Sequence, residues 1–142
     1  MVAHNRQRST KQLSSSFNIF ILKERISNEL KDSLKTGDKI KRLVLGMLIS
    51  AIKNKELTKR GQLSKTITNP VELEKQSQLN DEEILEVIAS EAKKRRESIE
   101  QFQAGGRAEL AEKEQVELDI LISYMPEQMS EADLSALVEK VI

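Results

Sequence analysis

The stretch KRRESIEQFQAGGRAELAEKE, residues 94–114, decides the fold of this chain. Two consecutive glycines, Gly105 and Gly106, interrupt a pattern in which apolar residues recur every three or four positions. Glycine most readily ends a helix, because it adopts the left-handed conformation without strain. The stretch therefore predicts the end of one amphipathic helix, a tight turn and the start of a second helix packed against the first.

The same stretch places charged residues among apolar ones. At 100° per residue, Arg95 shares a helix face with Ile88 and Ile99, and Glu114 shares a face with Leu118. A buried charge is costly unless it is paired. We therefore expect Arg95 to bond Glu114, or Glu117 one turn further on, as a structural ion pair that sets the register of the two helices.

Helical patterns continue on both sides of this hairpin, and no stretch alternates with a period of two. A first helix is expected over about 20–35, ended by Gly37. A second is expected from the N-cap Asp38 to about residue 59, ended by Gly61. Five apolar residues are predicted to share its core face: Ile40, Val44, Met47, Leu48 and Ala51. Leu45, Ile49 and Ile52 widen this apolar stripe, so the helix is expected to be the most buried one.

The remaining elements follow from caps and breakers. The connector 61–79 is polar and is expected to be mobile or only partly helical. Asn80 followed by Glu83 predicts a capping box at the start of the hairpin's first helix. The second hairpin helix should run over about 108–124, and a further amphipathic helix should begin after Ser130.

These elements predict an all-α protein, an antiparallel helical bundle followed by the first helix of a truncated helical tail domain. The expected division is a disordered leader over 1–21, the helical domain over 22–126 and an incomplete tail over 127–142. The leader holds three basic residues and no acid, so a transit peptide is the alternative to disorder. We expect a cytoplasmic protein, or an organellar one if residues 1–21 are a targeting segment.

Residues 94–114 resemble the RRESIEQ…AGR..LA.KE signature of the YqeY-like family, and LDILISYMPEQM, residues 118–129, is similar to the family's L.IL..YLP.Q. The resemblance covers about residues 22–142. It implies a GatB/YqeY-type helical protein, related to the tail of the B subunit of glutamine-dependent aminoacyl-tRNA amidotransferases. It further implies kinship with carbon–nitrogen ligases that use glutamine as amido donor, and tRNA or a tRNA-amidotransferase complex as partner.

The residues predict no reaction centre. The chain has no cysteine and one histidine, His4, and it has neither a phosphate-binding glycine loop nor a nucleophile elbow. We therefore predict no catalytic residues, no metal site and no cofactor, and an amidotransferase assignment rests on resemblance alone. No apolar run approaches the ~20 residues of a transmembrane helix, so no membrane partner is predicted.

Basic residues are the remaining candidates for function. The net charge is zero, but residues 108–142 hold nine acidic and two basic residues, which leaves residues 1–107 with an excess of seven positive charges. Two groups are candidates for nucleic-acid binding: the helical stripe Arg42, Lys53 and Arg60, with Lys39 nearby, and the run Lys93, Lys94 and Arg96. The alternatives are a solvated face, or a protein-interaction module that docks an apolar helix face on a partner without any RNA role.

Overall fold

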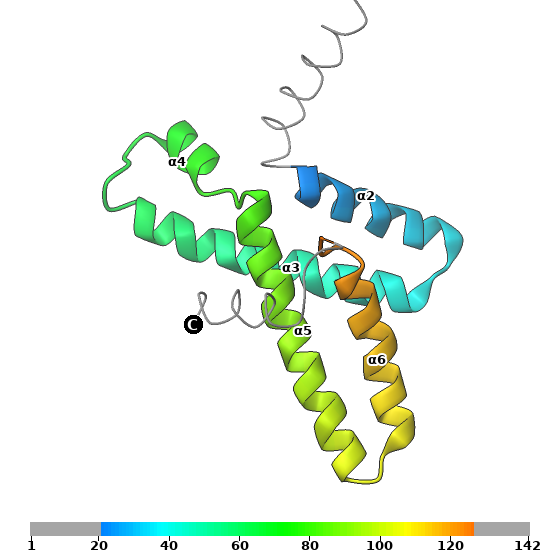
Figure 1. The fold of residues 1–142 in the computed structure, drawn as a ribbon. Helices are drawn as coiled ribbons and strands as arrows, with labels where there is room; N and C mark the ends of the chain where they lie inside the picture. Colours follow the sequence, from blue (N-terminus) through cyan, green and yellow to red (C-terminus); the bar gives the residue numbers. More distant parts are fainter. Residues whose placement is uncertain (1–20, 127–142) are drawn as a thin grey trace, which may run out of the picture.

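The computed structural model describes residues 21–126, and within that range the chain is helical without any strand (Figure 1). The all-α prediction is therefore confirmed. The helices, with their bounds, are α2 (Ile21–Thr36), α3 (Lys39–Leu63), α4 (Pro70–Gln76), α5 (Asp81–Ala104) and α6 (Ala108–Ile122). The expected leader and tail helix lie outside the described residues.

Two antiparallel hairpins form the fold. Helices α2 and α3 make one hairpin, α5 and α6 make the other, and α5 crosses the long α3 near its middle (Figure 1). Both turns depend on a glycine with positive φ, 76° at Gly37 and 72° at Gly106. A side chain disfavours this conformation, which is why glycine occupies both positions.

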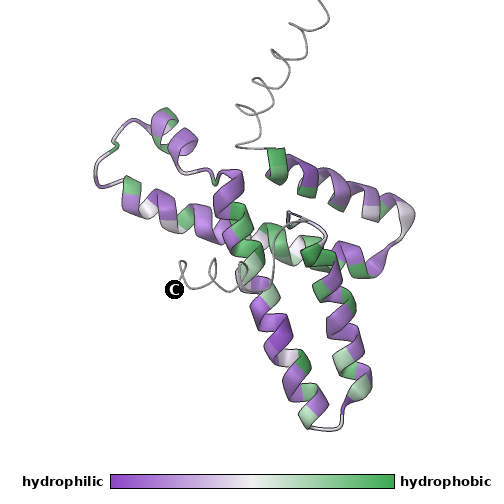
Figure 2. Cartoon of the chain, viewed as in Figure 1, coloured by the Kyte–Doolittle hydropathy of each residue, from purple (hydrophilic) through white to green (hydrophobic). Residues whose placement is uncertain are grey.

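The core lies where the hairpins cross (Figure 2). Leu45, Leu48 and Ile52 of α3 and Ile84 and Ile88 of α5 are almost completely inaccessible. A second, smaller cluster, Ala92, Ile99, Ala111 and Leu118, joins α5 to α6 further along the second hairpin. The core consists mainly of aliphatic side chains. Helix α3 lies at its centre and contacts every other described helix.

The structure corrects two predictions for α3. The helix does not end at Gly61 but runs through it to Leu63, because backbone bonds continue to Ser64 and a helix tolerates an internal glycine. The buried face also differs in part from the predicted one. Val44, Leu45, Leu48 and Ile52 are buried as expected, but Ile40 and Met47 are nearly half exposed. A helix that is apolar on most sides leaves the choice of face to its neighbours.

The connector is partly helical, as expected, because it contains α4. Asn69 caps this short helix and Pro70 occupies its first turn. After α4, two side chains of α3 form hydrogen bonds with the backbone that leads into α5. Glu56 accepts bonds from Lys23 Nζ at 2.7 Å and from the Leu79 backbone N–H at 3.1 Å. Lys59 Nζ donates to the Gln78 carbonyl at 3.2 Å.

The predicted capping box starts α5. The Asn80 side chain accepts from the Glu83 N–H at 2.9 Å, and Glu83 accepts from the Asn80 N–H at 3.1 Å. Glu83 also receives Lys59 Nζ at 2.9 Å, which links the start of α5 to α3. The second hairpin helix, α6, ends at Ile122, two residues before the predicted end.

Candidate nucleic-acid interface

Helix α3 carries the strongest charge imbalance of the described helices. It contains seven basic residues and one acidic residue, Glu56, and therefore has six excess positive charges. Three of the basic side chains meet carboxylates: Lys41 with Glu29, Lys59 with Glu83, and Arg60 with Glu74. The other four have no carboxylate partner in the described range; they are Lys39, Arg42, Lys53 and Lys55.

The stripe predicted on α3 is exposed along its length. Arg42, Lys53 and Arg60 all lie on the solvent side of the helix. Arg60 forms a close ion pair with Glu74 of α4, so its charge is partly offset. Lys53 and Arg60 both line a small hollow of about 240 Å³ beside Glu74. The stripe therefore offers two cations, Arg42 and Lys53, without partners among residues 21–126, and one that is shared with an acid.

The run on α5 does not join this stripe. Lys93 and Lys94 are exposed, whereas Arg96 is half-buried and has an interaction partner. Lys94 Nζ lies 3.5 Å from Glu91 Oε1. Lys94 also lines a hollow with Lys55 of α3. The cations of this run thus divide between separate surfaces, as expected for neighbours that point about 100° apart on a helix.

The sequence analysis placed Lys39 near the stripe but missed Lys55 as a member of the basic surface. Both are exposed and without a carboxylate partner in the part of the chain that the structure describes. Lys55 lies on a different side of the helix from Arg42 and Lys53, so a search for one stripe passes over it. Counting charges over the whole predicted helix would have found it.

Arg95 lies between the two hairpin helices. Its Nη1 donates to Glu117 Oε2 at 2.6 Å and to Glu114 Oε2 at 3.0 Å, so the structure brings together the three residues that the face analysis selected. The Arg95 side chain is 11% exposed and the whole Glu117 residue 4%. Arg95 Nη2 also lies 3.7 Å from Met47 Sδ of α3. The guanidinium thus connects α5, α6 and α3.

Tyr124, two residues beyond the end of α6, has a buried polar group that the sequence analysis did not single out. It is 5% exposed, and the Arg25 guanidinium lies 4.9 Å from its ring centroid. Burial raises the pKa of Tyr124 above its ordinary value, the nearby Glu29 carboxylate raises it further, and Arg25 opposes the rise. At neutral pH this hydroxyl is therefore protonated and does not serve as a general base.

The exposed cations of α3 are suited to binding anions. No cluster of three acidic, histidine or cysteine side chains suited to a metal ion occurs among residues 21–126. No helix within the same range has the length and hydropathy needed to cross a bilayer.

The family model described as Yqey-like protein matches residues 23–142. The chain belongs to the YqeY-like family. This match begins at Lys23, the third residue of α2, and extends over the rest of α2 and all of the later helices described above.

This YqeY-like chain is similar to several fungal proteins. It is 27% identical over 119 residues to "Altered inheritance of mitochondria protein 41, mitochondrial" of Saccharomyces cerevisiae, which covers 82% of this chain and 56% of that protein. It is 30% identical over 105 residues to "Uncharacterized protein C22F3.15" of Schizosaccharomyces pombe, which covers 74% of this chain and 72% of that protein. The match to the Candida glabrata protein 41 is 24% identical over 102 residues, 72% of this chain and 48% of that protein.

The YqeY-like chain thus spans about half the length of the Saccharomyces relatives that it matches. The names of the Saccharomyces and Candida relatives mention mitochondria, and none of the names given above mentions tRNA or an amidotransferase. The expected RNA and amidotransferase partners are therefore matters for proposal.

Proposed function

We propose that this chain is an accessory module of amidotransferase-related tRNA metabolism that binds tRNA through the exposed cations of α3 and performs no amide transfer itself. The observation that carries the proposal is the charge of α3, seven basic residues against one acidic residue, four of the seven without a carboxylate partner in the described range. An unbalanced row of cations attracts a polyanion by releasing its counterions.

The spacing of the cations suits a phosphate backbone. Arg42 and Lys53 are eleven residues apart, roughly 16 Å along the helix axis. Lys39 extends the same exposed side toward the start of α3. Such a row contacts several phosphates on one side of an RNA helix. None of the chain's four aromatic residues belongs to α3, so bases have nothing to stack on there, and the binding should read backbone shape instead of sequence.

The test is tRNA binding measured by fluorescence anisotropy over a range of salt concentrations. The Arg42→Gln/Lys53→Gln double variant removes two cations from the stripe. The matched control, Lys31→Gln/Lys113→Gln, removes two exposed cations from α2 and α6. We expect the stripe variant to bind tRNA about tenfold more weakly at low salt and to lower the slope of log K against log salt by roughly 1.5. The control should change little. Equal effects of both variants, or no salt-sensitive binding by the parent chain, would contradict the proposal.

The alternative function is a helical protein-interaction module with no RNA role. It is favoured by the exposed apolar residues Leu43 and Met47 on α3. Capture of a protein partner that survives high salt, in a chain that does not bind tRNA, would support this alternative.

We also propose that the chain acts in mitochondria and not in the cytoplasm. The support is the printed mitochondrial description of the yeast relatives together with Arg6, Arg8 and Lys11 in an acid-free first segment. Fusion of residues 1–22 to a fluorescent reporter tests this. Import of the reporter supports the proposal, and a reporter that stays in the cytosol contradicts it.

A further inference from the structure

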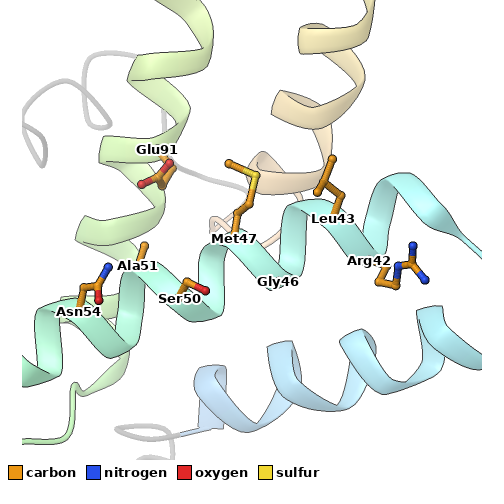
Figure 3. A pocket seen from close by; sticks show the side chains of 8 residues that line it. All are labelled: Arg42, Leu43, Gly46, Met47, Ser50, Ala51, Asn54 and Glu91. Carbon is orange, nitrogen blue, oxygen red and sulfur yellow. The ribbon is translucent and has the colours of Figure 1, made fainter.

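A groove runs along α3 on the side that faces α5. It consists of two adjoining hollows of about 550 and 320 Å³ that share Ala51, Asn54 and Glu91. In Figure 3, Leu43 and Met47 project from α3 on this side, and Glu91 faces them from α5. We call this surface, from Arg42 to Thr58 of α3 with Val87, Ser90, Glu91 and Lys94 of α5, the α3–α5 groove.

The floor of the groove at the Met47 end is apolar and open. Leu43 is 51% exposed and Met47 48%, and Gly46 and Ala51 between them add no polar group. Large apolar side chains that line a hollow together indicate a surface that is covered in the functional protein. The periodicity of α3 assigned Met47 and Ala51 to a core face, and a covering element would bury them as that pattern predicts.

The edge of the groove selects the charge of what covers it. Arg42, Lys55 and Lys94 line it, and Glu91 is the single acid among the lining residues. The surplus is therefore two positive charges, three bases against one acid. A suitable occupant is apolar on one face and acidic beside it.

We propose that residues 130–142 of the same chain occupy the α3–α5 groove as an amphipathic helix. In helical spacing this segment places four apolar residues on one face, Leu134, Leu137, Val138 and Val141. Its acids, Glu131, Asp133 and Glu139, outnumber its one base, Lys140. The segment thus has the apolar face and the acidic character that the groove requires.

The point of attachment favours this occupant over a separate partner. Arg95 holds Glu117 of α6 at 2.6 Å and lies 3.7 Å from Met47, so α6 stands beside the Met47 end of the groove. The chain remains packed into the core as far as Met125. Residues 127–130 then reach up to ~14 Å, and a 12-residue helix is ~18 Å long, against ~22 Å for the groove from Leu43 to Thr58. A tether this short gives the segment a millimolar effective concentration at the groove.

The proposal does not depend on RNA binding. Arg42 belongs to the stripe and also lines the groove, but Lys39, Lys53 and Arg60 do not line it. Occupation of the groove leaves these three cations outside the covered surface. Failure of one proposal therefore does not imply failure of the other.

The absence of cysteine from the chain gives a direct test. Met47→Cys is combined in turn with Leu134→Cys, Leu137→Cys and Val141→Cys, so that each variant has a single possible disulfide. The matched controls carry Val71→Cys in place of Met47→Cys, because Val71 is an apolar residue of α4 that is 78% exposed and outside the groove. Disulfide formation in the full-length chain is followed by non-reducing electrophoresis, with circular dichroism as the check of folding.

We expect at least one groove pair to close within a monomer roughly tenfold faster than its Val71 counterpart. Equal rates for groove and control pairs overturn the proposal. Disulfides that form only between chains also overturn it, because they assign the groove to a second copy. Should Met47→Cys fail to fold, Leu43→Cys probes the same end of the groove and is read in the same way.

Discussion

Removal of the Arg95 guanidinium tests the energetics of the second hairpin. The variant Arg95→Met keeps the length of the side chain and much of its apolar contact. It leaves Glu117, which is 4% exposed, without a bonding partner in the described part of the chain. Glu114 loses the same partner, but its side chain is 21% exposed and reaches water. The cost should therefore come mainly from the Glu117 carboxylate.

The magnitude follows from this burial. Breaking a buried ion pair on one side costs about 3–5 kcal/mol, since the remaining charge is uncompensated. We take the lower end, about 3 kcal/mol, because the Glu114 side chain is 21% exposed and its carboxylate can turn to water, which leaves one buried charge uncompensated instead of two. For a domain of this size that corresponds to a fall in Tm of roughly 10–14 °C.

Replacement of both charges should restore most of the loss. Arg95→Met/Glu117→Leu substitutes apolar groups for the pair, and such exchanges are often neutral or stabilising. The control, Lys94→Met, removes a neighbouring exposed cation and should change the free energy of unfolding by no more than about 0.5 kcal/mol. Urea and thermal unfolding followed by far-ultraviolet circular dichroism measure all three variants. The reasoning is refuted if Arg95→Met loses less than about 1 kcal/mol, or if the double variant is no more stable than the single one.

Three further predictions concern helix ends and Tyr124. Asn80→Ala removes the cap of α5 and should cost about 1 kcal/mol in urea unfolding, with an unchanged midpoint contradicting the capping assignment. Gly106→Ala should lower the free energy of unfolding by about 1–2 kcal/mol, because the φ of Gly106 is 72°. Gly61→Ala should raise it by about 0.5–1 kcal/mol, because Gly61 lies inside α3 with open space around it. Changes of the same sign for both variants would argue against these conformations. Because the pKa of Tyr124 is raised in the folded chain, the unfolded chain loses this proton first as the pH rises, so the free energy of unfolding should fall above pH 10. Tyr124→Phe should make this fall less steep. If the free energy of unfolding of both proteins declines in parallel above pH 10, Tyr124 is not the cause.

Local signals predicted most of the fold. The Asn80 and Glu83 capping box and the turn at Gly106 are set by residues within a few positions of one another, so the sequence alone could indicate them. Arg95 could be found because a charge on an apolar helix face requires a partner, and only facing residues of α6 could supply it. These predictions rest on physics that is local, or that is confined to one hairpin.

The errors arose where tertiary contacts decide. Gly61 resembles a helix stop, yet α3 continues past it, where Arg60 meets Glu74 of α4. The apolar stripe of α3 is wider than the surface that its neighbours cover, so its pattern alone could not show that Ile40 and Met47 stay exposed while Leu45 and Ile52 are buried. The basic surface was only partly recognised for a related reason. Whether a cation such as Arg60 is free depends on acids that lie distant in the sequence.

Glu56 and Lys59 of α3 hold the chain at the end of the connector, so the connector does not determine where α5 begins. Because Leu79 and Gln78 are anchored to α3 directly, the chain between Leu63 and these anchors can change in length without moving α5. Each doubling of a flexible loop costs only about 0.6 kcal/mol in closure entropy. This segment is therefore where related chains can gain or lose residues during evolution, and where a reporter peptide could be inserted without disturbing the crossing of the two hairpins.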